Sequence, residues 1–112
     1  MFTTLFRPVG PIELALIRDS DWTRFPPRLG DQPLFYPVVQ ETYARRIAAE
    51  WNVRESGEGH VVKFAVQTEF LQRYPEQVAG GIAHTEHWIP AEDLEAFNDH
   101  LIGKIALIAS YR

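Results

Sequence analysis

The densest group of chemically able side chains lies between residues 83 and 90, in the segment AHTEHWIP. His84, Glu86 and His87 offer two imidazoles and a carboxylate, which are groups that general acid–base catalysis and metal binding use often. A carboxylate can also stabilise a positive charge that develops on a substrate. If the protein has an active centre, we therefore place Glu86 in it.

A metal centre at this segment meets a geometric objection. On a strand, His84 and Glu86 share a face while His87 points the other way, so all three cannot bind one ion without a local bulge. The zinc-deaminase pattern also begins His-x-Glu, but it requires a later pair of cysteines, and this chain has none. We expect no metal; a metal-assisted hydrolase that uses His84 and Glu86 stays as the third alternative.

The sequence contains no motif for nucleophilic catalysis and no glycine-rich loop that would bind phosphate. Ser20, Ser56 and Ser110 lie outside any Gly-x-Ser-x-Gly elbow. The glycine-rich segment 55–59 lacks the Lys and the Ser or Thr that complete a nucleotide loop. What remains is a carboxylate on one expected strand, with an isolated arginine and a tyrosine on two others.

The arginine is Arg7, in the segment 2–9, which is β-branched and aromatic and is predicted to be the first strand. Leu5 and Val9 share its face, which is unusual for a guanidinium. One interpretation is a strand-end arginine that reaches water; the other is an anchor for phosphate or carboxylate, which a planar set of donors suits. The tyrosine is Tyr36, in a strand predicted over 33–38.

Two helices flank these strands in the N-terminal half. The first opens at Pro11 and is expected to end near residues 19–21. The loop 22–32 follows, in which Trp22 and Phe25 are expected to pack while Arg24 and Arg28 are within reach of an anionic ligand.

The second helix has its apolar residues at four-residue spacing. Tyr43, Ile47 and Trp51 form the stripe that we expect to be buried, with Asn52 at the C-cap. Glu41 and Arg45 are spaced to form a surface ion pair.

The C-terminal half is predicted to be mostly strands. Segment 60–66 alternates as a half-buried strand does, and 68–74 reads as a short helix. Gly80-Gly81 predicts a bend or bulge in 78–82. Pro90 opens a helix that ends at Gly103, and the strand 104–110, apolar on both faces, is expected at the centre of the sheet.

These elements predict a single α+β domain around a bent mixed or antiparallel sheet with three to four short helices. The length of 112 residues suits one domain, and 46% apolar residues can supply a core. The net charge of −4 without a basic run argues against a nucleic-acid partner, and no apolar run approaches the ~20 residues of a membrane span. We expect a soluble cytoplasmic protein with no membrane partner.

A carboxylate, an arginine and a tyrosine together suit chemistry at a glycosidic carbon with a good leaving group. Loss of nicotinamide from NAD passes through an oxocarbenium-like state that a carboxylate stabilises, and an arginine can hold the diphosphate. This interpretation makes NAD a substrate and requires that Arg7, Tyr36 and Glu86 meet in space.

Three segments carry a family resemblance. They are Phe6-Arg7-Pro8-Val9 with Glu13-Leu14, then Phe35-Tyr36-Pro37-Val38 with Tyr43-Ala44, and Glu86-His87-Trp88-Ile89-Pro90. In this order they resemble small bacterial proteins labelled ADP-ribosylation/crystallin, over nearly the whole chain, and more coarsely the ADP-ribosyltransferase-like fold.

The resemblance implies an NAD site in which Arg7 holds the dinucleotide, Tyr36 stacks on nicotinamide and Glu86 is the catalytic acid. We count His84 with Arg7 and Tyr36 among the cofactor-binding residues. The Ser-Thr-Ser run of arginine-modifying members is replaced by Phe35-Tyr36-Pro37. The resemblance therefore predicts a protein that binds NAD or a related nucleotide and either transfers ADP-ribose or hydrolyses NAD. The alternative is a non-catalytic binding module of the same fold.

Overall fold

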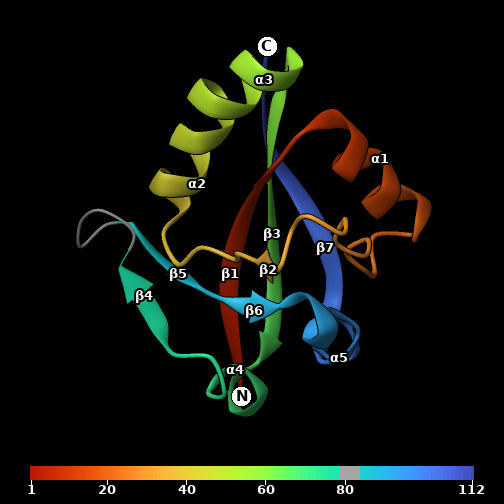
Figure 1. Ribbon diagram of the computed structural model, residues 1–112, viewed down its shortest axis with the longest axis vertical. Coiled ribbons are helices and arrows are strands. Elements are labelled where there is room, and N and C mark those ends of the chain that lie inside the picture. The colour runs from red at the N-terminus through yellow and green to blue at the C-terminus, as the bar shows by residue number, and fades with distance from the viewer. Residues whose placement is uncertain (79–83) are drawn as a thin grey trace.

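A computed structural model describes residues 1–78 and 84–112 of the chain. Its main sheet has three antiparallel strands in the order β1 (Phe2–Val9), β3 (Gly59–Gln67) and β7 (Leu101–Tyr111), with β3 in the middle (Figure 1). Lys63 of β3 is exposed while Val62, Phe64 and Val66 are buried, which confirms the predicted alternation over 62–66. His60 and Val61 are both buried, so the start of β3 is covered on both faces and is not half-buried as predicted.

Shorter strands extend the structure sideways from β1. Phe6 forms a bridge to Val38, and Val38 forms a bridge to Glu86 in β5 (Thr85–His87). β5 pairs with β4 (Glu76–Val78), and β2 (Leu34–Phe35) pairs with β6 (Ile89–Pro90). The strand predicted over 33–38 is therefore interrupted: Leu34 and Phe35 form a two-residue ladder, and Val38 forms separate bridges. Every pairing among the described residues is antiparallel.

The first helix, α1 (Pro11–Asp19), has the predicted bounds and begins with proline. The second predicted helix is longer than expected: α2 (Glu41–Ile47) continues through a π-helical turn, η1 (Ala48–Asn52), into α3 (Val53–Ser56). It ends at Gly57, whose φ of 82° is the left-handed conformation common after a helix. Asn52 is therefore not a C-cap.

The buried face of this helix also differs from the prediction. Ala44 and Ala48 are fully buried, whereas the side chain of Trp51 is 57% exposed. The reason is the close approach of β3: a Cβ atom placed on Gly59 would lie 2.0 Å from the carbonyl oxygen of Ala48. Only small residues fit between the helix and the sheet at this distance.

The C-terminal elements start and end elsewhere than predicted. α4 (Thr68–Leu71) stops before Tyr74, and the helix after Pro90 consists of the 3₁₀ turn η2 (Ala91–Asp93) and α5 (Leu94–Asp99). Gly103 does not end that helix but lies inside β7, with a φ of 71°. The predicted bend at Gly80-Gly81 falls outside the described residues.

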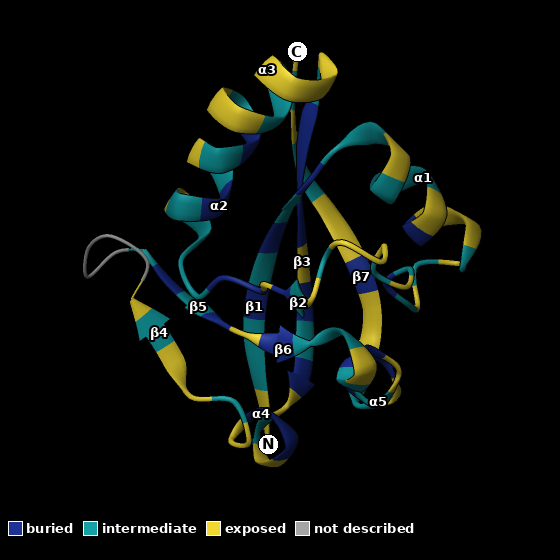
Figure 2. Cartoon of the chain, viewed as in Figure 1, coloured by how far each residue is buried: buried dark blue, intermediate teal, exposed yellow. Residues whose placement is uncertain are grey.

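The expectation that 104–110 lies centrally in the sheet is wrong. β7 is an edge strand, and most of its length is exposed (Figure 2). Loop residue Trp22 covers part of this edge, because its carbonyl oxygen accepts a 2.7 Å hydrogen bond from the N–H of Ile105. The apolar residues that predicted a central strand are partly exposed, among them Ile102 and Leu107.

Two clusters of buried side chains lie against the main sheet. The larger holds Phe25, Phe35, Phe64 and Phe97, and the rings of Phe25 and Phe64 meet edge to face at 4.8 Å. The smaller, under α2, is built from the buried residues Val38, Ala44, Ala48 and Val61. Phe25 fixes the loop 22–32 to the core, as expected from its residue type.

The structure is a single α+β domain with antiparallel sheets. Its radius of gyration of 13.0 Å matches the ~13 Å expected for a compact chain of this length. Within the described ranges, no helix has the length and apolar character needed to cross a membrane.

Candidate functional site

A cavity of about 620 Å³ opens where β1 ends, between α1 and the α2–η1 helix. Figure 1 shows these two helices on either side of the upper part of β1. The loop after α1 forms a further wall. The polar and aromatic residues that line it include Arg7, Glu13, Arg28, Tyr36, Trp51, Asn52 and Glu86.

The cavity brings together Arg7, Tyr36 and Glu86, which the sequence analysis singled out from three separate strands. Backbone pairing explains how they approach one another. Val38 exchanges hydrogen bonds of 2.9 and 2.7 Å with Phe6, next to Arg7, and also forms a bridge to Glu86. Neighbouring strands lie about 4.8 Å apart, so two ladder steps connect the three segments.

The guanidinium of Arg7 is buried, with 8% of the residue exposed. Its Nε and Nη2 donate to the two carboxylate oxygens of Glu13, at 2.6 and 2.9 Å. Nη1 donates to the backbone oxygen of Tyr36 at 3.4 Å, and the guanidinium carbon lies 4.6 Å from the ring centroid of Phe35. Arg7 is therefore a buried, bidentately paired cation and not a strand-end arginine in water.

Glu13 and Arg28 belong to the site, and the sequence analysis did not assign them to it. Arg28 Nη1 lies 3.8 Å from Glu13 Oε1, and Arg28 Nε donates to the carbonyl oxygen of Leu34 at 3.1 Å. Burial, together with the nearby positive charge of Arg7, lowers the pKa of Arg28. From the sequence, Arg28 is predicted only to be a loop arginine within reach of an anion, because spacing does not show that the loop folds back onto α1.

The side chains of Tyr36 and Glu86 are more exposed to solvent than that of Arg7. Tyr36 is 36% exposed at the wall of the cavity, so its ring is available to a ligand. Glu86 is half-buried, and its Oε1 accepts a 2.8 Å hydrogen bond from the indole Nε1 of Trp88. This bond orients the carboxylate and leaves Oε2 as its second acceptor.

The π-helical turn η1 supplies another wall of the cavity through Trp51 and Asn52. Turns of this kind occur often at functional sites. Within the described part of the chain, Asn52 Oδ1 is the one buried side-chain oxygen or nitrogen without a hydrogen-bond partner. The exposed indole of Trp51 offers a flat apolar surface, so the residue predicted to be core belongs to the site.

His84, predicted to bind the cofactor, lines a second and smaller hollow of about 280 Å³. Its ring stacks on that of Tyr43, with centroids 4.5 Å apart. Burial, and secondarily the negative charge of Glu86, raises the pKa of Tyr43. Trp51 and Ile47 line both hollows, whereas His84 lines only the smaller one. His84 therefore does not share the cavity with Arg7.

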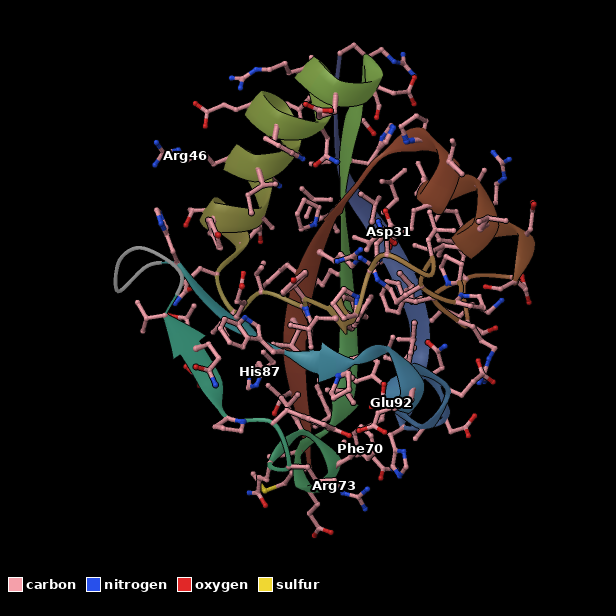
Figure 3. All side chains as sticks on the ribbon, viewed as in Figure 1. Asp31, Arg46, Phe70, Arg73, His87 and Glu92 are labelled. Atoms are coloured by element: carbon pink, nitrogen blue, oxygen red, sulfur yellow. The ribbon has the colours of Figure 1, made fainter. Side chains whose placement is uncertain are left out.

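Other polar groups lie away from the cavity. Arg24 pairs with Glu95 and Asp99 at 3.0 Å each. His87 is buried, its Nδ1 lies 2.6 Å from the carbonyl oxygen of Tyr74, and Figure 3 shows it below β5 and β6. Among the described residues, no group of three or more His, Asp or Glu side chains is arranged to hold a metal ion.

A hydrogen-bonded group of three side chains beside Val9, at the end of the sheet where the cavity opens, was not predicted. His60 is buried, its Nδ1 lies 2.8 Å from Ser110 Oγ, and its Nε2 lies 2.8 Å from Glu58 Oε1. None of the three lines either hollow. The pairing of His60 with Ser110 in the β3–β7 register accounts for the contact.

No protein-family model matches this chain, and neither the curated proteins nor the solved structures contain a match.

Proposed function

We propose that the chain is an ADP-ribosyltransferase-like protein of the cytoplasm that binds NAD or a related nucleotide between Arg7, Tyr36 and Glu86. The observation that carries the proposal is that these residues, taken from three distant segments, line one cavity. A volume of about 620 Å³ lies in the range of small-molecule sites. The walls offer cations for phosphate and aromatic rings for planar groups.

Each residue has a role that follows from its surroundings. The buried guanidinium of Arg7, with Arg28 beside it, is suited to the diphosphate, because planar donors recognise phosphate oxygens in pairs. The exposed ring of Tyr36 is suited to stacking on nicotinamide. The carboxylate of Glu86 is suited to stabilising positive charge on the ribose.

The proposed reaction cleaves the bond between the ribose C1′ and the nicotinamide nitrogen. The electron pair of that bond leaves with nicotinamide, which becomes neutral, and C1′ becomes cationic. An oxygen of water or of an acceptor then bonds to C1′ and releases a proton. With water the product is ADP-ribose; with an acceptor it is an ADP-ribosylated molecule.

The test combines binding and turnover. We expect calorimetry to detect NAD binding to the wild type and chromatography to detect released nicotinamide. Glu86→Gln keeps the shape of the side chain but removes its charge, so we expect turnover to fall at least about 100-fold while NAD still binds. Glu92→Gln is the matched control, because Glu92 is exposed beside α5 and outside the cavity (Figure 3). Absence of NAD binding to the wild type contradicts the proposal.

A second candidate is a binding module without turnover. The observation that favours it is that the guanidinium of Arg7 and one oxygen of Glu86 are already engaged, by Glu13 and Trp88. A ligand must compete with these bonds. Binding of NAD with no release of nicotinamide, unaffected by Glu86→Gln, supports this candidate over the enzyme.

A further inference from the structure

The guanidinium groups of Arg7, which is buried, and of Arg28, which is partly exposed, share one carboxylate at the wall of the cavity. The side chains of Arg7, Arg28 and Glu13 are only 9%, 11% and 19% exposed. Arg7 donates hydrogen bonds to both carboxylate oxygens of Glu13, whereas Arg28 Nη1 lies 3.8 Å from one of them. The cluster therefore holds two positive charges and one negative charge.

Arg28 carries the uncompensated charge. Its Nε is bound to the carbonyl oxygen of Leu34, and its terminal Nη atoms make no hydrogen bond to another described residue. Neither Nη atom is among the buried atoms of the described residues that lack a partner, so both are open to the cavity, where an anion can reach them. Burial and the positive charge of Arg7 lower the pKa of Arg28, as expected for a cation in excess.

The surroundings of the cluster add to its attraction for anions. α1 begins at Pro11, and the first turn of the helix borders the cavity through Gly10, Ile12 and Glu13. The N-terminal end of a helix carries a partial positive charge and free N–H groups. Glu13 lies in this turn, so its carboxylate already occupies the position at the N-terminus of α1 where the helix dipole favours an anion.

We propose that Arg7 and Arg28 form a phosphate subsite in which Glu13 is a resident counter-ion that the incoming phosphate displaces. The ligand class is a phosphate or diphosphate group, as free anion or as part of a nucleotide. Two of its oxygens replace those of Glu13 on Arg7, and another oxygen takes the free Nη atoms of Arg28. The inference that this phosphate belongs to NAD rests on the proposed function. The existence of the phosphate subsite does not.

The consequence is that Glu13 sets the affinity of the site by competing with the ligand. Removing an acidic residue from a protein of net charge −4 would raise anion binding slightly at any position. Removing Glu13 takes away the bidentate partner of Arg7 and leaves two cations facing the cavity without a carboxylate, so we expect a far larger gain in anion binding here than elsewhere.

The experiment measures binding of inorganic pyrophosphate by calorimetry at low ionic strength. We expect Glu13→Gln to bind pyrophosphate about tenfold or more tightly than the wild type, which corresponds to the loss of one competing ion pair. Glu41→Gln is the matched control, because Glu41 pairs with Arg45 at 2.7 Å but lies outside the cavity. We expect its affinity to stay within twofold of the wild type.

Arg28→Gln in the wild-type background keeps the proposal testable if Glu13→Gln fails to fold. We expect this variant to lose pyrophosphate binding, and the double variant with Glu13→Gln to lose most of the gain. Circular dichroism of each variant checks that the fold is retained. A folded Glu13→Gln protein with unchanged or weaker binding overturns the proposal, as does a folded Arg28→Gln protein that binds as the wild type does.

Failure of this inference can be told apart from failure of the proposed function. If Glu13→Gln strengthens pyrophosphate binding while NAD does not bind to either protein, the subsite stands and the NAD proposal is wrong. If NAD binds the wild type and neither ligand responds to Glu13→Gln, the NAD proposal stands and the role of Glu13 is wrong.

Discussion

Arg7 shows how a single residue can be both structural and functional. Its contacts with Glu13 and with the ring of Phe35 bury it against the core. A lysine could not reproduce them, because it lacks the planar set of five donors. The same planarity suits a phosphate, so the side chain can exchange one bidentate partner for another without leaving its place.

Tyr74 is a second residue whose environment has a measurable consequence. Its hydroxyl group donates to Asp93 Oδ2 at 2.8 Å, and Tyr74 packs against the ring of Phe70. Burial and the hydrogen bond to Asp93 raise the pKa of Tyr74. The hydrogen bond joins the segment after α4 to the turn before α5.

This raised pKa predicts how stability depends on pH. Because the folded protein holds the proton more tightly than the unfolded chain, the contribution is complete below the unfolded pKa of about 10 and is lost as the pH rises through the folded pKa. We expect urea unfolding to show a decline in stability above pH 10 that Tyr74→Phe makes shallower. At neutral pH the variant should lose about 1 kcal/mol. An equally steep decline in Tyr74→Phe would contradict this assignment. Tyr43, whose pKa is also raised, contributes to the decline that remains in this variant.

At the scale of elements, the contact between β3 and the α2–η1–α3 helix decides the shape of the site. Gly59 allows the strand to touch the carbonyl group of Ala48. That carbonyl accepts the N–H of Val53, five residues on, which is the hydrogen bond of the π turn. Trp51 and Asn52 reach the cavity from this turn, so the backbone contact fixes the helical turn from which both side chains reach the cavity.

Gly59→Ala tests this contact. A Cβ atom 2.0 Å from the oxygen of Ala48 and 2.8 Å from the Cβ of Asn52 cannot be accommodated without moving the helix. We expect a loss of about 3 kcal/mol in the free energy of unfolding, at the upper end of overpacking effects, and weaker ligand binding. Gly30→Ala is the control, because no atom of the described residues, its two chain neighbours aside, lies within 4 Å of its added Cβ. Its stability should stay within about 0.5 kcal/mol of the wild type.

At the scale of the whole molecule, the loop between α1 and β2 connects the core to the cavity. The N–H of Phe25 donates to Asn98 Oδ1 at 2.9 Å, and Asn98 Nδ2 donates to the carbonyl oxygen of Phe25 at 3.0 Å. Three residues later, Arg28 lines the cavity. A buried amide on α5 thus holds the loop that carries the proposed phosphate contact.

Asn98→Ala should therefore affect both stability and binding. It leaves the N–H and the carbonyl group of Phe25 buried without partners, which we expect to cost about 2–3 kcal/mol. Trypsin should cleave after Arg24 or Arg28 faster than in the wild type, because the loop opens more often. Gln72→Ala, at an exposed amide, is the control. Unchanged cleavage of a destabilised Asn98→Ala protein would show that the loop is held by other contacts.

Much of the fold was predictable because it depends on local rules. The start of α1 at Pro11, the alternation over 62–66 in β3 and the pair Glu41–Arg45, found at 2.7 Å, all follow from spacing and residue type. The position of β7 did not follow, because an apolar run on a strand does not tell whether the strand is central or at an edge. The burial of Ala44 and Ala48 in place of Trp51 depends on how closely β3 approaches.

The sequence by itself determined which groups this protein has for chemistry: an arginine among apolar neighbours, a tyrosine and a carboxylate on separate strands, no cysteine and no nucleophile motif. Only the tertiary structure decided that Arg7, Tyr36 and Glu86 line one cavity, that Glu13 and Arg28 join them, and that His84 does not. The physical reason is that spacing fixes the face of an element, whereas long-range strand pairing and loop packing fix which faces meet.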